Sequence, residues 1–207
     1  MGKENRQEES LLEVLLVAGR RDMLDGFVQS LRLARLEPRE IEVLPLALLR
    51  FLQKEDREKV VAIVDIANGV SNVVIAEAGN PRLARIIPTG LQEAEELVAA
   101  GWELENLPKH LPSDSPEANS DGILINNLRT TIGFYQSQGD SPSPEKILLS
   151  GKGALIPGLP EHLHSQLGIP VSMINPLERL GIDNHRMNSF SVKYALSMSL
   201  ACRGWED

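Results

Sequence analysis

Three β-rich runs follow one another between residues 60 and 87, and they constrain the fold more than any other feature of the sequence. The runs are Val60–Ile66, Ser71–Glu77 and Arg82–Ile87. Asn68-Gly69 joins the first two, and both residues tolerate the positive φ that a type I′ hairpin turn requires. The second and third runs are separated by a Gly-Asn-Pro turn at residues 79–81. We therefore expect an antiparallel meander of three strands.

Helical and extended segments alternate after these runs. A helix is expected from Gly90 to about residue 100, and helical periodicity returns over Ile123–Gln138. Strands are expected at Lys146–Leu149 and Ile169–Ile174, with a helix between them and a final helix over residues 192–200. The order three antiparallel strands, helix, helix, strand, helix, strand, helix is found in one lobe of an actin-like (ribonuclease H-like) fold. The expected fold class is thus α/β with a mixed sheet.

The first 59 residues predict a smaller α/β subdomain that precedes this lobe. Strands are expected at Glu13–Ala18 and Arg39–Leu44, on either side of a helix over Arg21–Leu36 with one apolar face to bury. A short helix follows from Pro45 to residue 52. We expect residues 1–10 to be disordered, 11–59 to form this subdomain and a charged connector, and 60–207 to form the lobe. A Pro-rich loop is expected at 106–121, where three prolines stand among Ser, Asn and Asp.

Composition and charge exclude several kinds of function. Hydrophobic residues make up 42% of the chain and aromatic residues only 4%, so the core must be aliphatic. The 29 acidic and 21 basic residues give a formal net charge of -8, which disfavours nucleic acid as a partner. No apolar run approaches the length of a spanning helix, so no direct membrane insertion is expected. The single cysteine, Cys202, fits a reducing compartment such as the cytoplasm.

Two turns are the candidate chemical sites. They are residues 64–72, with the sequence VDIANGVSN, and residues 148–159, with the sequence LLSGKGALIPGL. In actin-like ATPases, Gly-rich turns of this kind donate backbone N–H groups to phosphates, and an Asp at a strand end positions hydrated magnesium. A P-loop is a poorer interpretation of Gly151-Lys152, because Lys146 and Gly153 stand where that motif requires Gly and Ser or Thr. His162 and His164 lie two apart on a predicted helix, which is poor geometry for a metal site.

Together the two turns resemble the second phosphate turn and the adenosine turn of the PilM family, actin-like proteins of type IV pilus assembly that are related to the cell-division protein FtsA. Further short segments resemble the family in the same order along nearly the whole chain. These segments are LLVA at 15–18, RD at 21–22, LEP at 36–38, PLAL at 45–48, RIIPTG at 85–90, YQSQ at 135–138 and INPLE at 174–178. The chain therefore resembles a truncated and divergent member of this family.

The resemblance implies a nucleotide site that is vestigial or still able to bind. Its expected residues are Asp65, Ala67, Asn68, Gly69, Ser71, Asn72, Gly90, Ser150, Gly151, Lys152 and Gly153. Asp65 would hold magnesium through water, so ATP and magnesium are the implied cofactors. The family has Gly at the positions of Ala67 and Lys152, which argues for altered turns because Gly accepts positive φ at little cost. Its first phosphate turn, an Asp-x-Gly motif, has no counterpart before Leu11, so the cleft is incomplete.

The same resemblance implies a scaffold in type IV pilus assembly or a related secretion platform, with no catalytic residue, and it favours the absence of enzymatic activity over its presence. Its expected partners are the cytoplasmic N-terminal peptide of a PilN-like inner-membrane protein, bound by a groove that involves Leu11–Leu52, and other pilus assembly proteins. The chain would be cytoplasmic and held at the inner membrane by its partner. Two alternatives stay open: an actin-like ATPase or ATP-regulated switch completed by a second polypeptide, and a decayed relative with little independent function.

Overall fold

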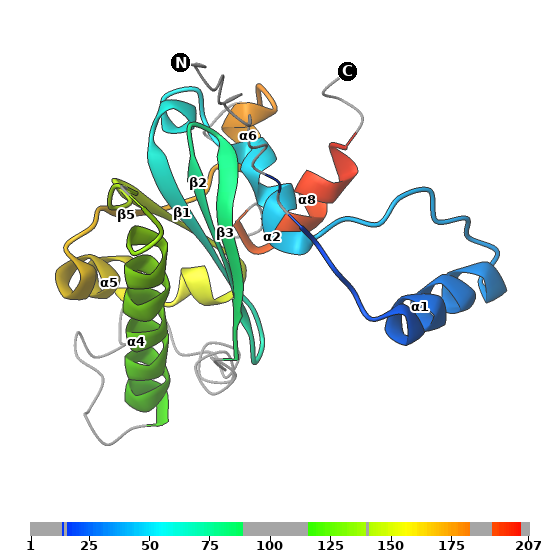
Figure 1. The fold of residues 1–207 in the computed structure, drawn as a ribbon, viewed down its shortest axis with the longest axis horizontal. Coiled ribbons are helices and arrows are strands. Elements are labelled where there is room, and N and C mark those ends of the chain that lie inside the picture. Colours follow the sequence, from blue (N-terminus) through cyan, green and yellow to red (C-terminus); the bar gives the residue numbers. More distant parts are fainter. Residues whose placement is uncertain (1–13, 15, 89–115, 140, 183–191, 204–207) are drawn as a thin grey trace, which may run out of the picture. The chain divides into compact units, whose positions relative to one another are not determined.

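A mixed sheet of five strands forms the centre of the structure. Its strands are β1 (Val60–Ile66), β2 (Ser71–Glu77), β3 (Asn80–Ile87), β4 (Lys146–Ser150) and β5 (Val171–Met173). They lie in the order β3-β2-β1-β4-β5 (Figure 1). The first three strands pair antiparallel, whereas β1, β4 and β5 run parallel. The expected meander and the two later strands are confirmed.

The computed structural model describes residues 14, 16–88, 116–139, 141–182 and 192–203. The helix expected after Gly90 and most of the expected Pro-rich loop lie outside these residues. The chain divides into two compact units, residues 1–41 and residues 42–207. None of the described helices combines the length and the apolar character needed to cross a bilayer.

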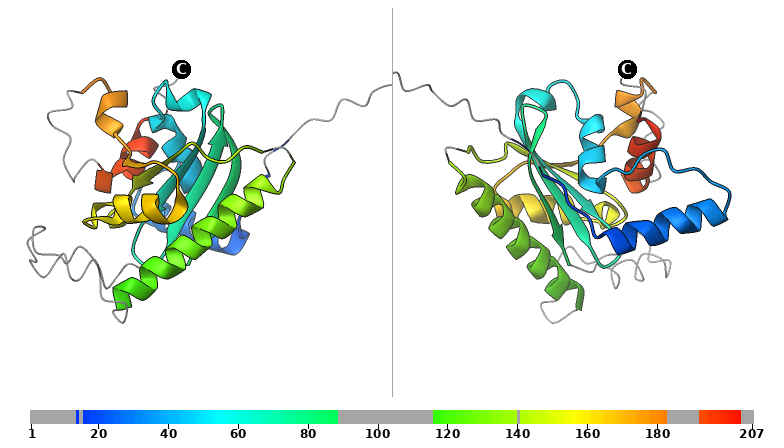
Figure 2. Two further views of the ribbon diagram at one scale, coloured as in Figure 1. Left: turned by 90° about the vertical axis from the view of Figure 1, so that its left-hand side faces the viewer. Right: turned by 45° about the vertical axis from the view of Figure 1, so that its right-hand side comes forward.

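Helices cover both faces of the sheet. On one face lie α4 (Pro116–Gln136) and α5 (Leu159–Leu167), and on the other lie α2 (Leu44–Ala47), the 3-10 helix η1 (Leu48–Phe51), α6 (Pro176–Arg179) and α8 (Ala195–Ala201) (Figure 2). Side chains alternate along β1, so that Val60, Ala62 and Val64 face the first layer while Val61 and Ile63 face the second. All seven residues of β1 are therefore buried.

Helix α4 begins earlier than its apolar pattern indicates. We predicted a loop to residue 121, but the helix starts at Pro116. Proline is well suited to the first turn of a helix because its fixed φ is already helical and its missing N–H would have no partner there. The polar residues that follow it are typical of a loop, but they occupy the first turns of the helix instead.

Residues 42–59 belong to the same compact unit as the sheet. Leu48, Phe51 and Leu52 are fully buried against β1 and β2. The charged stretch after them forms the short 3-10 helix η2 (Asp56–Glu58). Asp56 is buried in it, and its two carboxylate oxygens accept hydrogen bonds of 3.0 and 3.1 Å from Lys146 Nζ. The stretch that the sequence indicates as a connector is thus packed on the sheet.

The N-terminal unit contains helix α1 (Arg21–Leu33), three residues shorter than predicted. Arg35 has φ 59°, and the N–H groups of Arg35 and Leu36 donate to the carbonyls of Arg32 and Leu31. This is a Schellman cap, which ends the helix with arginine where glycine is usual. The strand expected at Arg39–Leu44 does not form, because no described strand lies beside it and Leu44 begins α2.

The apolar stripe of α1 is also not buried as predicted. The stripe consists of Leu24, Phe27, Val28, Leu31 and Ala34, and no residue of α1 itself is buried. A single helix cannot cover its own apolar face, and the strands expected to cover it are not present among residues 14 and 16–41.

The type I′ turn lies at a different place from the one predicted. Ala78 and Gly79 have φ values of 50° and 77°, as this turn type requires at both central residues. At Asn68-Gly69 only the glycine has positive φ, 73°. The more favourable Asn-Gly pair therefore forms another kind of turn, while an alanine occupies the left-handed position between β2 and β3.

Replacing Ala78 with asparagine is expected to raise the free energy of unfolding by about 1 kcal/mol, because asparagine tolerates the left-handed conformation that is costly for alanine. Urea unfolding followed by circular dichroism measures the change. Ala84→Asn is the matched control: Ala84 is exposed within β3, where asparagine is disfavoured, so this variant should lose stability. A loss of stability in Ala78→Asn would contradict the strain assigned to this turn.

Candidate functional site

Three of the predicted site residues form a row across adjacent strands at one end of the sheet. Asp65 near the end of β1 pairs with Asn72 of β2 on one side and with Ser150 of β4 on the other. Directly paired residues point to the same face of a sheet. The parallel pairing of β1 and β4 also brings their carboxyl ends to the same edge, so the two candidate turns lie next to each other.

The Asp65 carboxyl is an internal group of this row. Only 4% of the residue is exposed, and this burial raises its pKa. The neighbouring polar side chains of Ser150 and Asn72 lower the pKa, but they do not outweigh the burial. Asp65 therefore lies between its two strand partners, and Ser150 Oγ beside it is buried without a hydrogen-bond partner among the described residues. A carboxyl so little exposed cannot meet a hydrated magnesium ion unless the turns around it move.

Gly151 packs directly on the end of β1. It has φ 81°, and a Cβ atom added to it would lie 2.5 Å from the Ile66 carbonyl oxygen and 2.9 Å from Asp65 Oδ1. Its N–H donates to the Val192 carbonyl at 3.2 Å. Glycine is required here by the close approach of two backbones. Nothing in the sequence pattern indicates the contact with Val192.

The β1–β2 turn is closed by its own backbone. Ala67 N–H donates to the Val70 carbonyl at 3.0 Å, while Asn68, Gly69 and Val70 are exposed at the apex. Ser71 follows the turn and is fully buried. Because neighbouring strand residues point to opposite faces, Ser71 lies away from the row that contains Asn72.

The two residues that replace family glycines are not strained. Lys152 has φ −67° and precedes the 3-10 helix η3 (Gly153–Leu155), in which Gly153 is buried. The described non-glycine residues with positive φ are Arg35 and Ala78, so Ala67 is not among them. Neither residue therefore pays the left-handed penalty, and an altered shape of the two turns relative to the family stays a prediction. Gly90 lies outside the described residues.

These contacts do not fit a bound magnesium nucleotide. Asp65 is buried, Gly151 fills the space beside it, and the Ala67 N–H already has an acceptor. The parts of the chain that the structure describes also hold no group of three His, Cys, Asp or Glu side chains arranged for a metal ion.

Replacing Asp65 with asparagine is expected to change how stability depends on pH. Burial raises the pKa of Asp65 above its ordinary value of 3.8, so the folded chain binds the proton more tightly than the unfolded chain does. This contribution to stability is complete below pH 3.8 and is lost as pH rises through the raised pKa. The stability of Asp65→Asn relative to wild type should therefore increase with pH.

Urea unfolding at a series of pH values between about 4 and 8 measures this difference. A constant offset between the two proteins would come from the changed polar surroundings of Ser150 and Asn72, so the slope of the difference against pH is the informative quantity. Asp25→Asn, a substitution of an exposed carboxyl on α1, should leave the profile unchanged. A relative stability that falls with pH would contradict the buried position of Asp65.

Comparison with known proteins gives a family and a fold. A sequence model of the family described as "Type IV pilus assembly protein PilM" matches residues 1–205. The curated proteins compared with the chain include no match. One similar solved structure is a PilM-PilN type IV pilus biogenesis complex, with a TM-score of 0.67 and 24% identity over 91% of this chain and 59% of that one.

Other similar structures share the fold at lower identity. MreB5 of Spiroplasma citri bound to AMPPNP has a TM-score of 0.55 and 13% identity, covering 91% of this chain and 66% of that one. The ethanolamine utilization protein EutJ from Carboxydothermus hydrogenoformans has a TM-score of 0.53 and 17% identity, covering 91% of this chain and 62% of that one. The expected actin-like α/β fold is confirmed. The chain spans 59% to 66% of the length of these three proteins.

Proposed function

Because the chain belongs to the family of type IV pilus assembly proteins PilM, we propose that it is a non-catalytic adaptor of the pilus assembly machinery. The match of the family sequence model over residues 1–205 is the observation that carries this proposal. The adaptor acts in the cytoplasm and reaches the inner membrane through its partner. A related secretion platform would use the same kind of adaptor.

The geometry of the two turns supports the non-catalytic part of the proposal. An ATPase of this fold needs a carboxylate that can meet hydrated magnesium and backbone N–H groups that are free to meet phosphates. Here Asp65 is buried among its own strands and the Ala67 N–H is used within its turn. In this proposal the residues at positions 65–72 and 150–153 are the remains of a nucleotide site, now used to hold β1, β2 and β4 together.

We propose that the partner is the cytoplasmic N-terminal peptide of a PilN-like inner-membrane protein. The similar solved structure is a complex of PilM with PilN, which suggests this kind of partner. Helix α1 supplies a suitable surface, because Met23, Phe27 and Leu31 are exposed at helical spacing. A helix of this length is marginal in water unless its apolar face is covered. A bound peptide segment would provide that cover.

Titration of the labelled PilN-like peptide with the full chain tests the proposal, using fluorescence polarisation. Phe27→Asp is expected to weaken binding at least tenfold, because it places a charge on the apolar face. Phe134→Asp is the matched control, since Phe134 is an exposed phenylalanine on a helix of the other unit, 52% exposed against 65% for Phe27. Lack of binding by a chain shown to be folded, or an equal loss in both variants, would refute the proposed site.

An ATP-regulated switch completed by a second polypeptide is the second candidate function. It is favoured by the preserved pairing of the two turns at one edge of the sheet, with Asp65 beside Ser150. Isothermal titration with magnesium ATP separates the candidates. Heat of binding followed by turnover would replace the adaptor proposal, whereas absence of heat at high nucleotide concentration would remove the switch.

A further inference from the structure

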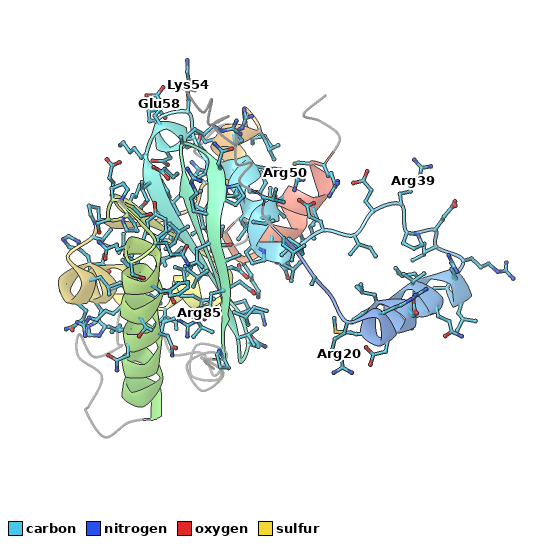
Figure 3. All side chains as sticks on the ribbon, in the orientation of Figure 1. Arg20, Arg39, Arg50, Lys54, Glu58 and Arg85 are labelled. Atoms are coloured by element: carbon cyan, nitrogen blue, oxygen red, sulfur yellow. The ribbon has the colours of Figure 1, made fainter. Side chains whose placement is uncertain are left out.

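The turn between β1 and β2 carries an asparagine that is directly followed by glycine, Asn68-Gly69. Both residues are exposed, as is Val70 after them. Figure 3 labels Lys54 and Glu58 at the end of the sheet where β1 begins, and the β1–β2 turn lies at the opposite end. Water can therefore reach both the side-chain amide of the asparagine and the main-chain amide that follows it.

Hydrogen bonds close the turn around this pair but do not include it. The Ala67 N–H donates to the Val70 carbonyl at 3.0 Å. Neither the Asn68 side chain nor the Gly69 N–H has a hydrogen-bond partner among the described residues. Gly69 also carries no side chain, and a Cβ built on it would meet nothing within 4 Å. The Gly69 nitrogen is thus unobstructed on the side of the asparagine amide.

We propose that Asn68 is a site of spontaneous deamidation that the folded chain leaves open. The Gly69 amide nitrogen, after losing its proton to base, attacks Asn68 Cγ. A bond from this nitrogen to Cγ forms, the bond from Cγ to Nδ2 breaks, and Nδ2 leaves as ammonia. The product is a five-membered succinimide ring. Water then opens the ring at Cγ, which gives aspartate, or at the main-chain carbonyl, which gives isoaspartate.

The other described asparagines lack one of these conditions. Asn80 and Asn175 precede Pro81 and Pro176, whose nitrogens carry no proton to lose and cannot attack. Asn72 is only 8% exposed and lies within β2, paired with strands on both sides. The asparagines of α4 are followed by residues whose N–H groups belong to the hydrogen bonds of the helix. The fold therefore selects the pair in the β1–β2 turn.

Deamidation would change both the charge and the length of the turn. Either product adds one negative charge to a chain whose formal net charge is -8, and this charge would repel an anion near the turn. Isoaspartate also adds one carbon to the main chain, between the Ala67–Val70 hydrogen bond and its return. The pairing that begins at Ile66 and Ser71 would then be less well matched. The proposal goes beyond the adaptor function and does not depend on it.

Incubation of the full chain at mildly alkaline pH tests the proposal, with digestion at acidic pH and tandem mass spectrometry to locate aspartate and isoaspartate. In the folded chain, conversion at Asn68 should be at least about tenfold faster than at Asn72, because Asn72 must first be exposed by local unfolding. The rate at Asn68 should be close to its rate in the chain unfolded by guanidinium chloride. Ammonia should be released in the same amount as Asn68 is lost.

Gly69→Ala is expected to slow conversion at Asn68 at least about tenfold, because it places a side chain beside the attacking nitrogen. Gly79→Ala is the matched control: Gly79 has a similar φ of 77° in the β2–β3 turn, but Ala78 precedes it. This variant should leave the rate at Asn68 unchanged. Circular dichroism verifies that each variant is folded. If Gly69→Ala does not fold, Asn68→Gln replaces it, since its longer side chain would have to close a six-membered ring.

Four results would overturn the proposal. The first is conversion at Asn68 that is no faster than at Asn72 in the folded chain. The second is a rate at Asn68 more than about tenfold below that of the unfolded chain, which would show that the fold protects this residue. Equal slowing by Gly69→Ala and Gly79→Ala is the third, because hairpin stability would then control the rate. The fourth is release of ammonia from Asn68→Gln at the wild-type rate.

Discussion

Gly151→Ala is expected to lower the free energy of unfolding by about 2–5 kcal/mol. The left-handed φ of 81° costs an alanine about 1–2 kcal/mol, and the added Cβ would lie 2.5 Å from the Ile66 carbonyl oxygen. That distance is far below van der Waals contact with backbone, so β1 and the β4–η3 turn must separate, and overpacking of this kind costs about 1–3 kcal/mol more. Urea unfolding at neutral pH measures the total.

Gly69→Ala isolates the conformational part of this effect. Gly69 has nearly the same φ, 73°, but no atom lies within 4 Å of its added Cβ. It should therefore lose only about 1 kcal/mol. Equal losses of stability in the two variants would contradict the close packing of Gly151 on β1. If Gly151→Ala does not fold, the double variant Gly151→Ala with Asp65→Gly is the next test. It removes the Asp65 carboxylate, one of the two groups that the added Cβ would meet, so recovery of folding would support the contact.

The meander could be predicted because β-rich runs and turn chemistry act on neighbouring residues. The runs of β1 and β2 are joined by Asn68-Gly69, which admits few alternatives to a hairpin. The type of turn could not be predicted, because the register between β2 and β3 decides which residues become the turn. That register places Ala78 in a conformation that its own propensity disfavours.

The site shows the same division between local and distant effects. Short motifs predict Asp65, Asn72 and Ser150 as site residues. Their row across three strands follows from pairing between distant segments, which the motifs do not contain. The motifs carry no information on burial, so they could not show that the Asp65 carboxyl is internal. The sequence also does not indicate the pocket that the structure has between η1 and the Ala78–Asn80 turn. These two segments are about 30 residues apart in the sequence, and neither contains a recognisable motif.

The prediction that the N-terminal segment buries its apolar face is wrong for another reason. Its apolar stripe correctly indicated helix α1, since periodicity reflects which residues share a face. Burial of that face depends on a second surface, and residues 14 and 16–41 supply none. The predicted strand at 39–44 likewise lacks a neighbouring strand. A pattern that predicts an element therefore does not establish what packs against it.

Lys146→Met is expected to lower the free energy of unfolding by about 2–3 kcal/mol. Lys146 Nζ contacts both oxygens of Asp56, and the carboxylate is only 5% exposed. Removing the ammonium group leaves a buried charge without its partner, which usually costs about 3–5 kcal/mol. The smaller figure is expected here because the Lys146 side chain is 31% exposed and water can reach the pair.

Arg82→Met is the matched control, since the Arg82–Glu77 pair has a similar separation of 2.9 Å but both side chains are 36% exposed. Its loss should stay below about 1 kcal/mol. The double variant Asp56→Asn with Lys146→Met should be more stable than Lys146→Met alone, because it no longer buries an unpaired charge. Equal losses for Lys146→Met and Arg82→Met would show that the Asp56 pair adds no more than a surface pair. In that case the apolar packing of Leu48, Phe51 and Leu52 would be what holds residues 42–59 to the sheet.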